Sequence, residues 1–169
     1  MLANMFGPKR IQNLPDDLRQ SVGEDALARL AVDAAQVVGL QNSRLAVGPA
    51  SAQSDPQRLL AILTYSYAAG IYASQAIEWS CHHDPIVRTL CGGPPPDWSA
   101  VWRFRNANRP WVEECLARLY DAACRGVPAG KQPSFGAGPI SEVAPSSELI
   151  EFARQKVRRA SRTDSALYE

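Results

Sequence analysis

The chain has 169 residues, of which 46% are hydrophobic and 21% are charged, and its formal net charge is +1. This length fits one domain with extensions and leaves no room for a large multidomain enzyme. The apolar stretches are shorter than the roughly 20 residues of a membrane span, and the start of the chain lacks the basic and apolar regions of a secretory signal. We therefore expect a cytoplasmic protein without a membrane association, whose cysteines are reduced thiols.

The first predicted helix spans residues 23–38, where apolar side chains recur every three or four positions. Gly39 is expected to stop this helix. Asp55-Pro56 has the N-cap aspartate and first-turn proline of a second helix start. The sequence that follows, RLLAILTYSYAAG, is apolar almost all round, which predicts a helix at the centre of a bundle that ends near Gly70.

Two short helices are expected next. Ile77 and Cys81 lie one turn apart in a helix over residues 74–81, while Trp79 points elsewhere. Asp84-Pro85 repeats the cap-and-proline start.

The sequence GGPPP at residues 92–96 interrupts regular structure, because consecutive prolines fix φ and remove hydrogen-bond donors. Asp97 can then cap a helix that continues to about Ala107. Its expected inward positions are Val101 and Phe104, and the positions elsewhere on its surface are Arg103 and Arg105.

The remainder of the chain holds two more predicted helices. One lies beyond Pro110, with apolar residues from Trp111 to Ala123, and the other runs from Ser147, as its cap, to about Ala160. The Gly-, Pro- and Ser-rich stretch between them allows an ordered wrap or a flexible linker, and we take it as a linker. The expected units are an arm at 1–22, a helical domain at 23–125, a linker at 126–146 and a basic helix and tail at 147–169.

No segment alternates with period two, so the expected fold class is all-α, a compact multi-helix bundle with a helix-turn-helix-like core. Particular residues at fixed spacing form a pattern that is more specific than the fold class. They are Asp55-Pro56 with Arg58-Leu59-Leu60, Tyr65-x-Tyr67-x-x-Gly70-Ile71, Ser74-x-x-Ile77-Glu78, Cys81-x-x-Asp84, and then Gly92 and Pro96-Asp97-x-Ser99-x-x-x-Arg103-Phe104-Arg105. The pattern resembles the amino-terminal domain of bacterial DDE-type insertion-sequence transposases over residues 55–105.

The resemblance implies a helical domain that binds the terminal inverted repeats of a transposon, with the catalytic acidic triad in a separate domain. Triad chemistry needs carboxylates that hold divalent metal ions on a strand-containing scaffold, which the residues after Arg125 cannot build. We therefore expect a transposase-derived DNA-binding protein with no catalytic activity, cofactor or metal ion, which regulates or inhibits transposition. Asn106-Ala107-Asn108 and Gln75-Ala76 replace residues that are commonly basic in the family, which thins the DNA-facing charge.

The candidate DNA contacts are Ser99, Trp102, Arg103, Arg105 and Arg109. A guanidinium group suits phosphate and guanine, although the arginines are also typical of a solvated helix face. Trp98 and Trp102 stand four apart, a spacing that favours one packed stripe over contact with DNA. Ser99 is expected to help cap its helix rather than to touch a phosphate.

The sequence also contains possible zinc ligands and a second group of basic residues. Cys81-His82-His83 and Cys91 lack the ligand spacing of a zinc site, so we expect buried cysteines. The basic residues between Arg154 and Arg162 suit a solvated helix, a second DNA contact or a partner-binding helix. The alternative function is a protein-protein interaction module that has lost DNA binding, with a homodimer or another protein bound through the C-terminal helix.

Overall fold

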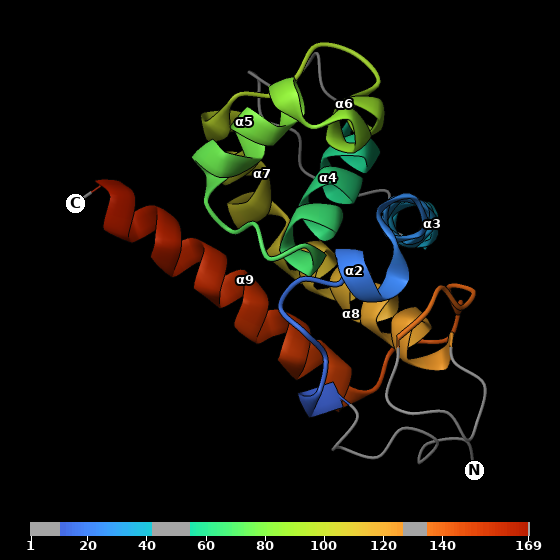
Figure 1. The fold of residues 1–169 in the computed structure, drawn as a ribbon. Coiled ribbons are helices and arrows are strands. Elements are labelled where there is room, and N and C mark those ends of the chain that lie inside the picture. The colour runs from blue at the N-terminus through green and yellow to red at the C-terminus, as the bar shows by residue number, and fades with distance from the viewer. Residues whose placement is uncertain (1–10, 42–54, 127–134, 169) are drawn as a thin grey trace.

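The computed structural model describes residues 11–41, 55–126 and 135–168, and the regular elements within these ranges are all helical (Figure 1). The expected all-α class is therefore confirmed. Helix α4 (Pro56–Ala68) lies among the others, and its residues from Leu59 onward are all buried. It packs against α3 (Glu24–Gln41), α8 (Arg109–Arg125) and two shorter helices, α6 (Pro85–Cys91) and α7 (Trp98–Ala107). A sequence that is apolar all round thus becomes the central helix, as predicted.

Aspartates begin three of these helices. The carboxylate of Asp55 accepts a hydrogen bond from the backbone N–H of Gln57 (3.0 Å) at the start of α4. Asp84 accepts from Ile86 N–H (2.9 Å) and begins α6 (Pro85–Cys91). Asp97 begins α7 (Trp98–Ala107). These starts are confirmed, because each cap satisfies backbone donors that have no partner within the helix.

Three helices are longer than predicted. Helix α5 (Ser74–His83) extends past Cys81, and α3 continues through Gly39 to its end. A Cβ atom at position 39 would lie 3.3 Å from the side-chain oxygen of Gln57, so the glycine allows close approach of α4 instead of ending α3. Helix α9 (Ser147–Tyr168) continues well beyond Ala160, and Ser146 rather than Ser147 provides the side-chain oxygen at its start.

The stretch after α8 is packed where the structure describes it. Phe135 is buried, and Gly136 and Gly138 donate backbone hydrogen bonds to the carbonyls of Ala123 (3.0 Å) and Ala122 (3.1 Å). The last carbonyls of a helix lack partners within it, so this segment satisfies the end of α8. Residues 135–146 therefore form the ordered wrap and not the flexible linker that we took them for. Residues 127–134 of that expected linker lie outside the described residues.

Both ends of the described chain join the same core. In the expected N-terminal arm, Ile11, Leu14 and Leu18 are buried, and Leu18 N–H donates to the carbonyl of Ala68 (2.9 Å) just before the short helix α2 (Arg19–Val22). Residues 1–10 of that arm are outside the described ranges.

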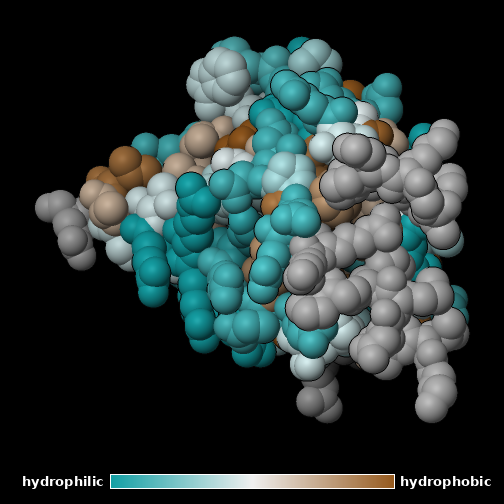
Figure 2. Space-filling model, turned by 60° about the horizontal axis from the view of Figure 1, so that its bottom comes forward, coloured by the Kyte–Doolittle hydropathy of each residue, from teal (hydrophilic) through white to brown (hydrophobic). Residues whose placement is uncertain are grey.

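Helix α9 lies along α8 and the lower end of α4 (Figure 1). Its buried positions at helical spacing are Leu149, Ala153, Val157 and Ala160. Hydrophilic side chains cover much of the face in Figure 2, on which the solvent-facing side of α9 lies. No helix in the described ranges is long and apolar enough to span a bilayer.

Candidate nucleic-acid interface

Helix α7 turns one side to the core and the other to solvent. Val101 and Phe104 are buried as predicted, whereas Trp102 is 41% exposed and Arg103 is also exposed. Trp98 is only partly buried. The prediction that Trp98 and Trp102 form one packed stripe is therefore wrong, because Trp102 projects from the outer face of the helix.

The guanidinium of Arg103 is held over the first turn of α7. Its Nε donates to the carbonyl of Ser99 (3.2 Å) and one terminal nitrogen donates to Ser99 Oγ (2.9 Å). Ser99 Oγ in turn donates to the carboxylate of Asp97 (2.9 Å). The other terminal nitrogen of Arg103 has no hydrogen-bond partner among residues that the structure describes, so it is available to an incoming acceptor.

Asp97 fixes the start of the same helix. Its carboxylate accepts from the backbone N–H of Ala100 (2.8 Å). This hydrogen bond, followed by the one from Ser99, lowers the pKa of Asp97 below its ordinary value of 3.8. The side chain therefore caps α7 as a carboxylate.

Arg105 does not lie on the surface of α7, contrary to expectation. Its side chain is 1% exposed, and its Nη1 donates to the carboxylate of Asp164 (2.6 Å) in α9. The same carboxylate accepts from the backbone N–H (2.8 Å) and the hydroxyl (2.6 Å) of Ser74. In this arrangement Arg105 cannot reach a nucleic acid, because it joins α7 to α5 and α9 inside the protein.

The hydroxyl of Tyr67 adds a further contact to this buried group, since Arg105 Nη1 lies 3.5 Å from it. Burial raises the pKa of Tyr67 to about 12. Burial by itself lowers the pKa of Arg105, but Tyr67 and Asp164 outweigh that effect and raise it. Arg105 is therefore a permanent buried cation with a carboxylate partner.

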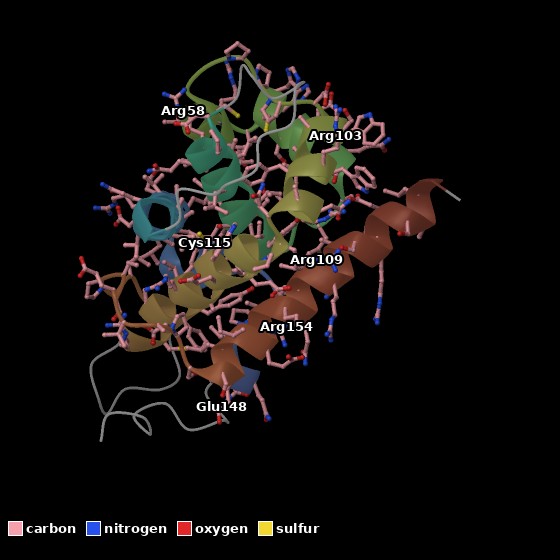
Figure 3. The ribbon with its side chains drawn as sticks, turned by 180° about the vertical axis from the view of Figure 1, so that it is seen from behind. Arg58, Arg103, Arg109, Cys115, Glu148 and Arg154 are labelled. Carbon is pink, nitrogen blue, oxygen red and sulfur yellow. The ribbon has the colours of Figure 1, made fainter. Side chains whose placement is uncertain are left out.

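Arg109 begins α8 and is partly buried between α8 and α9. One of its terminal nitrogens donates to Ser161 Oγ (3.0 Å). Figure 3 shows Arg109 beside α9, while Arg103 lies further up on α7. The structure thus leaves Ser99, Trp102 and Arg103 together on α7, and separates Arg105 and Arg109 toward α9.

A second exposed aromatic side chain lies on α5, the helix packed against α7. Trp79 is 61% exposed and stacks on His83, with 4.3 Å between ring centroids. The carboxylate of Glu78, beside it in the chain, accepts from the backbone N–H of Trp98 (3.1 Å) and so connects α5 to the start of α7. The helical position of Trp79, opposite Ile77 and Cys81, indicated its exposure.

The four cysteines are buried, as predicted. Across the three described ranges, no three side chains among His, Cys, Asp and Glu cluster in a way that could hold a metal ion.

Comparison with protein families gives a match to part of the chain. Residues 29–107 match a family model described as Transposase domain (DUF772), which takes in most of α3 and all helices from α4 to α7. No curated protein and no solved structure matches the chain. The family match overlaps the residues that resemble transposases, and it supports a transposase-related protein with a role connected to transposition.

Proposed function

We propose that this protein binds DNA at transposon ends through its transposase-related domain and does not itself catalyse strand transfer. Helices α5, α6 and α7 act as a helix-turn-helix-like unit, and α7 approaches the major groove. The observation that carries the proposal is the outer face of α7, where an exposed tryptophan and a partly unengaged arginine, Trp102 and Arg103, lie side by side in the chain within the matched region.

The chemistry of this face suits nucleic acid. Arg103 can direct its unengaged nitrogen to a phosphate or to a guanine edge, and Trp102 can stack on a base or pack against a sugar. Ser99 positions Arg103 by accepting its hydrogen bonds, while its own hydroxyl hydrogen is directed to Asp97. Arg109 extends the surface toward α9. Arg105 is left out of this surface because it is buried in the ion pair with Asp164.

The acidic residues around α7 support a binding role rather than a catalytic one. Asp84 and Asp97 are committed to helix starts, and Asp164 to Arg105. A protein of this kind would occupy inverted repeats and block a complete transposase from them, as a regulator or inhibitor of transposition.

Fluorescence anisotropy of a labelled DNA duplex, titrated with the full chain at several salt concentrations, tests this proposal. We expect non-specific binding with Kd of about 10⁻⁴–10⁻⁶ M at physiological salt and tighter binding at low salt. The double variant Trp102→Ala/Arg103→Ala should weaken binding. Arg29→Ala is the matched control, because Arg29 is exposed on α3 and is not part of the proposed surface.

Absence of binding at low salt, or equal losses in the double variant and in Arg29→Ala, would overturn the proposal. The first result would instead favour a protein-protein interaction module. The exposed Trp79 and Trp102 on neighbouring helices support that second candidate, because large aromatic side chains are enriched in protein interfaces.

A further inference from the structure

Two cysteines from consecutive helices meet at one place in the fold. Cys81 is in the last turn of α5, and Cys91 is the last residue of α6. Only Asp84 separates the two helices, and both cysteines line the same groove, where their thiol groups interact with each other. Both side chains are largely buried, at 3% and 7% exposed.

This cysteine pair borders an open groove of about 590 Å³, which is also lined by His82, Arg88 and Thr89. A small polar molecule can therefore approach the two sulfurs from solvent. The other cysteines differ, because Cys115 is 0% exposed and Cys124 is 1% exposed. Burial raises the pKa of the Cys115 thiol, which donates to the carbonyl of Ala34 (3.6 Å) inside the core.

The interaction between the two thiols makes them chemically different. It lowers the pKa of Cys91 below its ordinary value and, together with burial, raises that of Cys81. Cys91 is thus the member of the pair that more readily becomes the nucleophilic thiolate, with Cys81 beside it as the second thiol.

We propose that Cys81 and Cys91 are an oxidation site whose two sulfurs form a reversible intramolecular disulfide when they react with hydrogen peroxide. The Cys91 thiolate attacks one peroxide oxygen, the O–O bond breaks, and the leaving hydroxide takes up a proton to become water. Cys91 is then a sulfenic acid. The sulfur of Cys81 attacks the Cys91 sulfur, the S–O bond breaks, and the departing hydroxide and the Cys81 proton form a second water. The two thiols are oxidised by two electrons, the peroxide is reduced, and a small-molecule dithiol reverses the reaction.

The disulfide has a structural consequence. It ties the end of α5 to the end of α6, where Arg58 already holds the chain by donating to the carbonyl of Cys91 (3.4 Å). A cross-link that closes the loop between Cys81 and Cys91 restricts the unfolded chain. We expect the urea midpoint of unfolding to move to a higher concentration in the oxidised protein.

The test treats the folded full chain with hydrogen peroxide, denatures it, alkylates the free thiols with N-ethylmaleimide and measures the intact mass. The untreated protein should take up four alkyl groups, one for each cysteine, and the oxidised protein should take up two. Peptide mapping should find Cys81 linked to Cys91, and dithiothreitol should restore all four thiols. Retention of four alkylatable thiols, over-oxidation of Cys91 without a disulfide, or a link to Cys115 or Cys124 would each overturn the proposal.

Variants separate the roles of the two sulfurs. Cys81→Ser should stop at a Cys91 sulfenic acid that dimedone traps, whereas Cys91→Ser should give no disulfide and no dimedone adduct at Cys81. Cys124→Ser is the matched control and should still form the cross-link. The decisive measurement uses the unmodified protein, so poor folding of a variant does not remove the test.

Discussion

Arg105 and Asp164 form a 2.6 Å ion pair from which solvent is almost completely excluded. They are far apart in sequence, in α7 and α9, and the hydrogen bonds from Ser74 bring α5 into the same group. The C-terminal helix is therefore fastened to the transposase-related helices by a buried charge pair as well as by apolar packing. An arginine that the sequence motif assigns to DNA has a structural role in this arrangement.

Removal of the carboxylate should destabilise the protein strongly. Asp164→Ala leaves the Arg105 guanidinium buried without its counter-charge, and we expect a loss of about 3–5 kcal/mol in the free energy of unfolding. Urea denaturation followed by circular dichroism measures it. As a control, Asp16→Ala removes an exposed partner of Lys156 and Arg159 and should cost no more than about 1 kcal/mol. A loss of less than about 1 kcal/mol for Asp164→Ala would contradict the role of the ion pair.

The burial of Asp164 could not be predicted from the sequence. Apolar residues mark the inward side of α9 only as far as Ala160, and the next inward position is an aspartate. Its partner is on another helix, so no spacing within α9 could reveal it. The burial of Arg105 could not be predicted either, because Arg105 borders the buried side of α7. Only the presence of α9 decides whether its side chain faces protein or solvent.

Local signals, in contrast, predicted the helix starts well. Asp55, Asp84 and Asp97 each act on backbone groups a few residues away, so a short stretch of sequence contains the whole interaction. The exposed position of Arg103 on α7 also follows from helical periodicity. The wrap at residues 135–146 could not be predicted in this way, because its hydrogen bonds join glycine amides to the distant end of α8.

The close contact between residues 135–146 and the end of α8 predicts that Gly136 does not tolerate a side chain. A Cβ atom at Gly136 would lie 2.6 Å from the carbonyl oxygen of Gly126, which is backbone and cannot rotate away. Gly136→Ala should therefore destabilise the protein by about 1–3 kcal/mol, as overpacking does in a core. The matched control is Gly93→Ala, where the nearest atom would be an Arg58 nitrogen at 3.7 Å, an ordinary contact. Equal urea midpoints for the two variants would show that the wrap does not contribute to stability.

The cap of α7 predicts a dependence of stability on pH. The pKa of Asp97 is lower in the folded protein than its ordinary value of 3.8, so the unfolded chain takes up the proton first as the pH falls. The stabilisation is fully present above about pH 4 and is lost as the pH falls through the folded-state pKa.

Asp97→Ala should accordingly cost about 1 kcal/mol at neutral pH, the usual value of an N-cap, and the difference from the unmodified protein should shrink in acid. Unfolding in urea at a series of pH values measures this difference. Asp97→Asn is the control, since asparagine also caps helices but does not titrate. A constant difference between Asp97→Ala and the unmodified protein down to acid pH would contradict this account.

Neighbouring arginines on α7 should respond to substitution in opposite ways. Arg103→Gln removes an exposed cation, so we expect a change in stability within about 0.5 kcal/mol and a salt dependence of DNA binding reduced by about one phosphate contact. Arg105→Gln removes a buried cation and leaves Asp164 without its partner, so it should destabilise the fold by several times that amount, about 3–5 kcal/mol. Urea unfolding and anisotropy on the same preparations compare the two variants. If Arg105→Gln instead kept full stability and lost DNA affinity, Arg105 would be a DNA contact and α9 would have to leave it when DNA binds.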